Sequence, residues 1–151
     1  MKHKLITCLV ISVLLISAII PAFAETSIER ITFDDGSYAI IETTVSQTPF
    51  TLFAAAKTKS ASRTYTYYAA DNIKKWDFSV NGTFSYDGST AKATSSSSSY
   101  NIYASGWSLV SRNASKSGAT ATATGTFKYA SITKSTTIGL KCSADGTISA
   151  V

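Results

Sequence analysis

Hydrophobic and polar residues alternate with a period of two along much of this chain. In the run Trp76–Tyr86, every second residue is aromatic, aliphatic or glycine, and the residues between are polar. The run Ala119–Tyr129 repeats the pattern, with Ala, Gly, Phe and Tyr alternating with Thr and Lys. Because successive side chains of a strand point to opposite faces, both runs are predicted to be strands with one buried face.

Turn signals separate these runs at short intervals. The dipeptides Asp35-Gly36, Asp87-Gly88, Ser105-Gly106 and Asp145-Gly146 each end one polar-apolar run and precede another. Short strands joined by such turns are typical of hairpin-built proteins. We therefore predict an all-β fold, an antiparallel β-sandwich of seven to nine strands and immunoglobulin-like, with a closed barrel as the alternative.

The shortest possible turns at Asp35-Gly36 and Asp87-Gly88 predict how the strands on either side of each turn pair. A two-residue Asp35-Gly36 turn predicts that Glu29 lies directly opposite Glu42. Pairing Ser89 with Tyr86 across the next turn predicts that small residues lie opposite the large apolar ones. These small residues are Ala91, Ala93, Ser95, Ser97 and Ser99.

The first 24 residues are predicted to be a signal peptide. A basic start is followed by the apolar stretch 5–20 and then Pro21, and Ala22 and Ala24 form the small-residue motif of a cleavage site. We expect a secreted, extracellular protein that meets a membrane only during export. The rest is predicted to be one domain: a hairpin and linker at 25–62, and the main β-sandwich portion at 63–151. Residues 46–62 lack a clear period and are predicted to be a linker or a short helix.

Composition after residue 24 excludes several chemistries. The only histidine, His3, precedes that point, so catalytic triads and histidine-based zinc sites have no ligand or base. Basic residues are scattered rather than clustered, which argues against nucleic-acid binding. We expect no metal and no cofactor, and no enzyme. One cysteine, Cys142, remains, and its spacing from Ile138 and Leu140 predicts burial, with an intermolecular disulfide as the alternative.

Carboxylates are the remaining route to catalysis. An opposed pair at Glu29 and Glu42 would suit retaining glycoside hydrolysis or help to hold calcium. The simpler interpretation, which we favour, is two exposed glutamates that repel one another mildly.

Aromatic residues supply the candidate binding site. Tyr65, Tyr67, Tyr68 and Trp107 are predicted ligand-binding residues, because exposed aromatic rings stack on sugar rings. Most aromatic residues of the chain are expected in the core, so one or two exposed rings would mark the binding surface.

Several segments together resemble an uncharacterised family of small secreted proteins of Gram-positive, clostridial-type bacteria. These segments are Asp34-Asp35-Gly36-Ser37-Tyr38, Thr64-Tyr65-Thr66-Tyr67, the stretch 81–89, the stretch 111–118 and Leu140-Lys141-Cys142-Ser143-Ala144-Asp145-Gly146. The resemblance covers most of the chain after the signal peptide. It implies an extracellular location and a β fold, and it supplies no catalytic residues.

The expected function is therefore that of a non-enzymatic binding module for a surface glycan or protein. A membrane-active toxin or bacteriocin-like protein is the first alternative, since Ser/Thr-rich strands that alternate with apolar residues also resemble membrane-inserting hairpins. A carboxylate-based glycosidase that uses Glu29 and Glu42 is the second.

Overall fold

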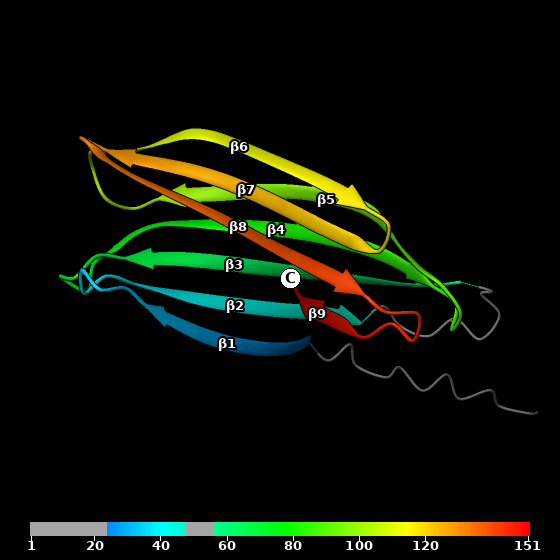
Figure 1. Ribbon diagram of the computed structural model, residues 1–151. Coiled ribbons are helices and arrows are strands. Elements are labelled where there is room, and N and C mark those ends of the chain that lie inside the picture. The colour runs from blue at the N-terminus through cyan, green and yellow to red at the C-terminus, as the bar shows by residue number, and fades with distance from the viewer. Residues whose placement is uncertain (1–23, 48–55) are drawn as a thin grey trace, which may run out of the picture.

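A computed structural model describes residues 24–47 and 56–151. The described residues contain nine antiparallel strands joined by turns and loops (Figure 1). Their bounds are β1 Ala24–Thr32, β2 Tyr38–Gln47, β3 Lys57–Tyr68, β4 Lys74–Tyr86, β5 Ala91–Ile102, β6 Trp107–Ser117, β7 Thr120–Tyr129, β8 Ile132–Cys142 and β9 Ile148–Ala150. No helix in the described part of the chain is long and apolar enough to cross a membrane.

The strands form two packed sheets, as the alternation predicted. One sheet has the order β1-β2-β3-β4-β5 and the other the order β6-β7-β8-β9. Figure 1 shows the second sheet lying across the first, with the chain passing between them once, from β5 to β6. The β-sandwich is thus confirmed, and the sheets do not close on themselves. Each sheet is a meander, whereas immunoglobulin domains use Greek-key connections.

The core lies between β3, β4 and β5 on one side and β7 and β8 on the other. Trp76, Phe78 and Phe84 of β4 face Phe127 of β7 and Leu140 of β8, and all five are fully buried. The inner faces predicted for β4 and β7 are therefore confirmed. Cys142 at the end of β8 is also buried, as its spacing predicted, and it has no disulfide partner among the described residues.

The first hairpin has a different register from the predicted one. Gly36 adopts a positive φ of 77°, and the loop closes through a Phe33 N–H bond to the Ser37 carbonyl oxygen. The turn therefore holds three residues, and the positive φ at Gly36 forms the bulge that such turns need. This shifts every pair by one residue, so that Glu29 lies opposite Ile41, and Ile28 lies opposite Glu42.

The predicted register of β5 is also wrong, because Tyr86 pairs with Ala91 rather than with Ser89, and a bulge follows. Ala93 lies opposite Phe84, but the pairing then shifts so that Ser95 meets Thr83 and Ser96 meets Gly82. The predicted placement of Ser95, Ser97 and Ser99 against the core residues is therefore wrong. A one-residue shift moves every following side chain to the other face.

The predicted linker is shorter than expected. Strand β2 continues to Gln47 and β3 begins at Lys57, so residues 57–62 belong to a strand of the main sheet. The rest of the predicted linker or short helix, at 48–55, lies outside the described residues, as does the predicted signal peptide up to residue 23.

Candidate functional site

A cleft of about 740 Å³ opens at the end of the sandwich where the β1–β2, β3–β4 and β7–β8 turns meet the β5–β6 loop. Figure 1 shows these four connections together at the left end of the molecule. We call this the end cleft. Its aromatic lining consists of Tyr67, Tyr103, Trp107 and Tyr129, and Ile73 and Ile132 add apolar surface.

Three of the aromatic rings form a continuous row of ring contacts. The Trp107 ring lies 5.7 Å from Tyr129 at an interplanar angle of 26°, and 5.7 Å from Tyr67 in an edge-on arrangement. Tyr67 is buried, Trp107 is half-buried and Tyr129 is 44% exposed, so the row of rings runs from the core out to solvent. Gly106 allows this arrangement, because any Cβ there would lie 2.6 Å from the Tyr129 ring.

The fourth ring, Tyr103, is held in place by a buried carboxylate. Its hydroxyl donates a 2.7 Å hydrogen bond to Asp77, and the Lys74 ammonium lies 3.9 Å from its ring centroid. Burial alone would raise the pKa of Asp77, but hydrogen bonds from Tyr103, Lys74 and Asn101 outweigh it and lower the pKa. Tyr103 as a residue remains 53% exposed. Tyr103 is therefore fixed where it borders the cleft, with its hydroxyl held by Asp77.

Two ion pairs border the end cleft. The Lys134 ammonium lies 3.1 Å from Asp35, and the Lys75 ammonium lies 2.7 Å from Asp71. Hydrogen bonds from the Ser37 hydroxyl and N–H, together with the one from Lys134, lower the pKa of Asp35 to about 2. A hydrogen bond from Lys75 likewise lowers the pKa of Asp71. Both carboxylates are ionised at neutral pH, so this border carries two positive and two negative charges.

Two of the four predicted aromatic residues line the end cleft, and two do not. Tyr67 and Trp107 belong to it. Tyr65 instead packs on Trp76 at a ring distance of 5.5 Å, and burial raises the pKa of Tyr65 to about 12. Tyr68 stacks on Tyr38 at 4.8 Å, beyond a bulge that separates it from Tyr67.

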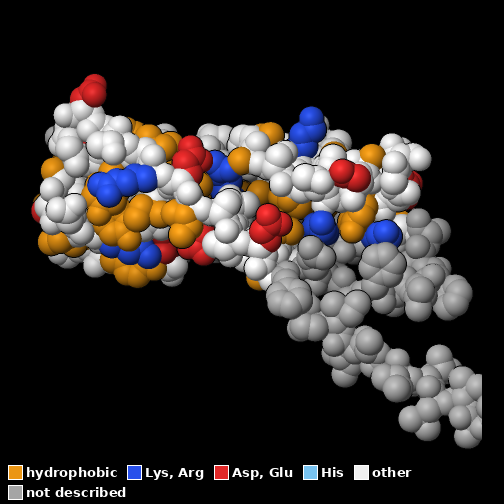
Figure 2. Space-filling view, turned by 90° about the horizontal axis from the view of Figure 1, so that it is seen from below, with side chains coloured by type: hydrophobic (Ala, Val, Ile, Leu, Met, Phe, Trp, Pro, Cys, Tyr) orange, Lys and Arg blue, Asp and Glu red, His pale blue; other side chains and the backbone are white. Residues whose placement is uncertain are grey.

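Sequence reasoning missed Tyr103 and Tyr129 as site residues. Tyr129 is the last residue of the alternating face of β7. It lies beyond Phe127, the last core residue of that strand, and this position was the available signal for an exposed ring. Tyr103 follows the point where the alternation in 100–103 breaks down, which indicated a departure from the sheet without showing where the ring goes. Viewed from below (Figure 2), hydrophobic side chains gather at this same end of the molecule, beside Lys and Arg side chains.

The carboxylate pair predicted at Glu29 and Glu42 does not exist. The shifted register places the two residues on opposite faces of the sheet. The Glu29 carboxylate instead accepts a 3.3 Å hydrogen bond from the guanidinium of Arg63 on β3. The geometric basis for a glycosidase that uses these two residues, or for calcium held between them, is therefore wrong.

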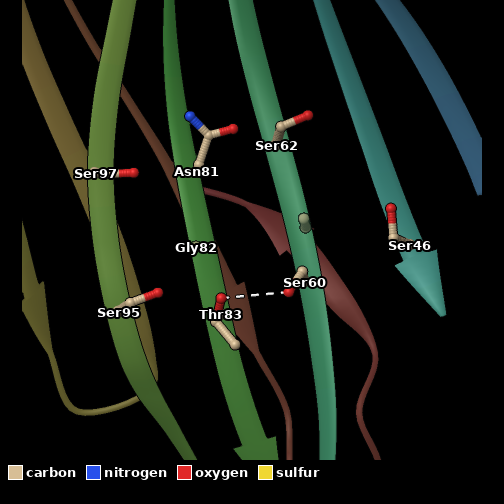
Figure 3. A pocket seen from close by; sticks show the side chains of 9 residues that line it. Ser46, Ser60, Ser62, Asn81, Gly82, Thr83, Ser95 and Ser97 are labelled. Atoms are coloured by element: carbon tan, nitrogen blue, oxygen red, sulfur yellow. Dashed lines mark hydrogen bonds between the residues drawn. The ribbon is translucent and has the colours of Figure 1, made fainter. Parts of the chain in front are cut away.

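A second hollow, of about 350 Å³, lies on the outer face of the five-stranded sheet (Figure 3). Serine and threonine hydroxyls and the Asn81 amide line it, and Ser60 and Thr83 lie within 3.3 Å of one another. Ser95 and Ser97 point into it because of the β5 bulge. Its lining has neither an aromatic ring nor a charge, so the end cleft offers more for recognition.

The end cleft thus combines exposed rings with paired charges. Flat aromatic surfaces favour the C–H faces of sugar rings or other flat apolar groups, while lysine and carboxylate groups provide donors and acceptors. Ligand sites in proteins commonly have this composition, an apolar lining with a few polar groups that fix orientation.

No known protein family model matches the chain, and no curated protein matches it. Among solved structures, the chain is similar to the crystal structure of the hypothetical protein lmo2686 from Listeria monocytogenes EGD-e. The two chains share 16% sequence identity with a TM-score of 0.47, and the match covers 83% of this chain and 93% of that one.

Proposed function

We propose that this chain is a secreted, non-enzymatic binding module that holds an uncharged sugar ring in its end cleft. The observation that carries the proposal is the row of ring contacts from Tyr67 through Trp107 to the exposed Tyr129, in a cleft that Tyr103 also lines. The partly exposed rings of Trp107 and Tyr129 give a sugar ring a surface to stack on.

The charges at the border favour a neutral ligand. Each lysine already has a carboxylate partner, so an anionic sugar would gain little net attraction and would have to compete with Asp35 or Asp71. Hydroxyl groups of a neutral sugar need no such exchange. They accept hydrogen bonds from lysine and donate them to a carboxylate at the same time.

The carboxylates of the end cleft suit binding better than hydrolysis. A glycosidase acid needs a raised pKa so that it carries a proton at neutral pH. The pKa values of Asp35 and Asp71 are instead lowered by their hydrogen-bond donors. These carboxylates are acceptors with no proton to give.

Secretion is the second part of the proposal and rests on the sequence at 1–24. The expected cleavage after Ala24 falls at the beginning of β1, so it would remove one residue of the described strands. Expression of the full-length chain in a Gram-positive host is expected to give protein in the medium that begins at Glu25. Intact protein retained in the cells would contradict this part.

The binding site can be tested with protein purified from that medium. We expect binding to neutral oligosaccharides on a glycan array, followed by a change in tryptophan fluorescence when a bound oligosaccharide is titrated in solution. Trp76 is 1% exposed and Trp107 lines the cleft, so the change should come from Trp107 and disappear in Trp107→Phe.

Tyr129→Ala should weaken binding at least tenfold, which corresponds to about 1.4 kcal/mol. Tyr100→Ala is the matched control, because Tyr100 is 38% exposed and does not line the end cleft. Absence of binding to any array glycan would overturn the proposal, and so would equal affinities for Tyr129→Ala and the control. Dye release from phosphatidylglycerol vesicles would favour the membrane-active alternative instead.

A further inference from the structure

The two edge strands of the five-stranded sheet, β5 and β1, differ in how far their outer backbone groups are already hydrogen-bonded. At the β5 edge, the Arg112 guanidinium donates to the Ser98 carbonyl oxygen at 3.0 Å, and the Lys116 ammonium donates to that of Thr94 at 2.5 Å. The Ala93 N–H also donates to the Gly118 carbonyl oxygen. Backbone groups of this edge are therefore already bonded to β6 and the following turn.

The β1 edge has none of these protections. All nine residues of β1 are exposed, and Ile28 at its centre is 72% exposed. The strand has no proline, lysine or bulge, three of the features that usually prevent pairing at an edge, and its acidic residues are Glu25 and Glu29. Its one arginine, Arg30, lies over the Tyr38 ring at 3.9 Å and so turns back onto the sheet.

The hairpin geometry shows which backbone groups of β1 point outward. Phe33 bonds across the hairpin through both its N–H and its carbonyl oxygen. Since these bonds alternate along an antiparallel pair, Ile31, Glu29 and Ser27 also bond toward β2. The N–H and C=O groups of Thr26, Ile28 and Arg30 therefore point away from the sheet.

We propose that two copies of this chain pair through β1 as an antiparallel, two-fold symmetric dimer with Ile28 opposite the partner's Ile28. The two-fold axis is then perpendicular to the sheet, so each face continues across the junction. Strand addition of this kind takes most of its affinity from backbone hydrogen bonds. The two Ile28 side chains pack on one another and cover the most exposed apolar residue of the strand.

Charge selects this register over its neighbours. With Ile28 at the centre, Glu25 lies opposite the partner's Ile31, and Glu29 lies opposite the partner's Ser27. A shift in one direction would bring Glu25 opposite the partner's Glu29, and a shift in the other would bring Glu29 opposite the partner's Glu29. Like charges directly opposite each other destabilise a pair of strands.

The dimer would be a continuous ten-stranded sheet with one end cleft at each extremity. The end cleft lies beside the β1–β2 turn, at the C-terminal end of β1, and antiparallel pairing sends the two copies in opposite directions. The two clefts therefore face away from each other, an arrangement that can bridge two separate surfaces.

Sedimentation velocity of the purified protein over a range of concentrations tests this proposal. We expect a monomer–dimer equilibrium that is lost in Ile28→Pro, because proline removes the outward N–H without affecting a bond to β2. Ile28→Lys should abolish the dimer independently by placing two ammonium groups on the symmetry axis. Val110→Lys is the matched control, since Val110 is 58% exposed on β6 and should leave the dimer unchanged.

Cross-linking tests the register. Opposed residues of a hydrogen-bonded pair have Cα atoms about 5.5 Å apart, which suits a disulfide. Ile28→Cys treated with oxidised glutathione should therefore give a covalent dimer on a non-reducing gel. Thr26→Cys should not, because residues 26 of the two copies would be about 13 Å apart. A monomer at every concentration would overturn the proposal, as would a dimer that persists in Ile28→Lys or equal cross-linking of the two cysteine variants.

Discussion

Gly125 sets the spacing between the two sheets, and replacing it with alanine should destabilise the fold. A Cβ at this position would lie 3.0 Å from two carbons of the buried Phe78 ring and 3.1 Å from a third. Carbon atoms pack best at about 3.5–4.0 Å, so all three contacts would be too short. The Phe78 ring has little room to move, because it is fully buried and packs edge-on against Phe127 at 6.1 Å.

The expected cost follows from two opposing effects. Overpacking a core by one methyl group costs about 1–3 kcal/mol. Alanine also restricts the unfolded chain, which returns about 0.4–1 kcal/mol. Gly125→Ala should therefore lower the free energy of unfolding by about 1–2 kcal/mol, and the melting temperature by about 3–6 °C for a domain of this size.

Urea unfolding followed by tryptophan fluorescence measures this change, and a double-mutant cycle identifies its cause. Phe78→Leu removes the ring that the new methyl group meets, so the double variant should be more stable than the sum of the single effects by about 1 kcal/mol. An unchanged midpoint for Gly125→Ala, or strict additivity with Phe78→Leu, would show that the contact between the sheets does not limit their approach.

Other expected outcomes concern the buried and titratable groups. Asp77→Asn should cost about 2 kcal/mol in urea unfolding, because the charged acceptor of the Lys74 and Tyr103 hydrogen bonds is lost; an unchanged midpoint would contradict this. The pKa values of Asp35 and Asp145 are lowered from 3.8 to about 2, first by hydrogen bonds from serine hydroxyls. Since the folded state binds these protons less well, the stability that the two carboxylates provide is present above about pH 4 and is lost as the pH falls toward 2. Melting curves recorded between pH 5 and 2 should show this loss, and Asp145→Asn should reduce the slope. Burial raises the pKa of the Cys142 thiol, so a thiol-specific reagent should label native protein much more slowly than protein in urea. Equal labelling rates would place the thiol at the surface.

Local alternation in the sequence was enough to predict strands, their inner faces and the sandwich. The inner faces of β4 and β7 repeat a strict period of two, and each buries its large residues as that period requires. Burial of Cys142 followed from the same rule. These predictions succeed because the face of a strand depends only on its own residues.

Register and site could not be derived in this way. The first hairpin shifted by one residue because Asp35-Gly36 fits both a two-residue and a three-residue turn, and the backbone of Gly36 decides between them. Nothing in the run of serines indicates the bulge in β5, because consecutive serines favour neither face of the sheet. The end cleft depends on four connections that are far apart in the sequence, so only the aromatic character of Tyr67 and Trp107 indicated it.

The order of the strands along the chain has a consequence for synthesis. Because each sheet is a meander, all five strands of the first sheet are made before Trp107, the first residue of the second. Until Phe127 and Leu140 follow, the apolar face that includes Trp76 and Phe84 has no partner to cover it. Any sheet that the first five strands form before then exposes this face, and such surfaces are prone to aggregation. Truncation after residue 106 should yield an insoluble product, whereas loss of a few residues from the N-terminal edge should not.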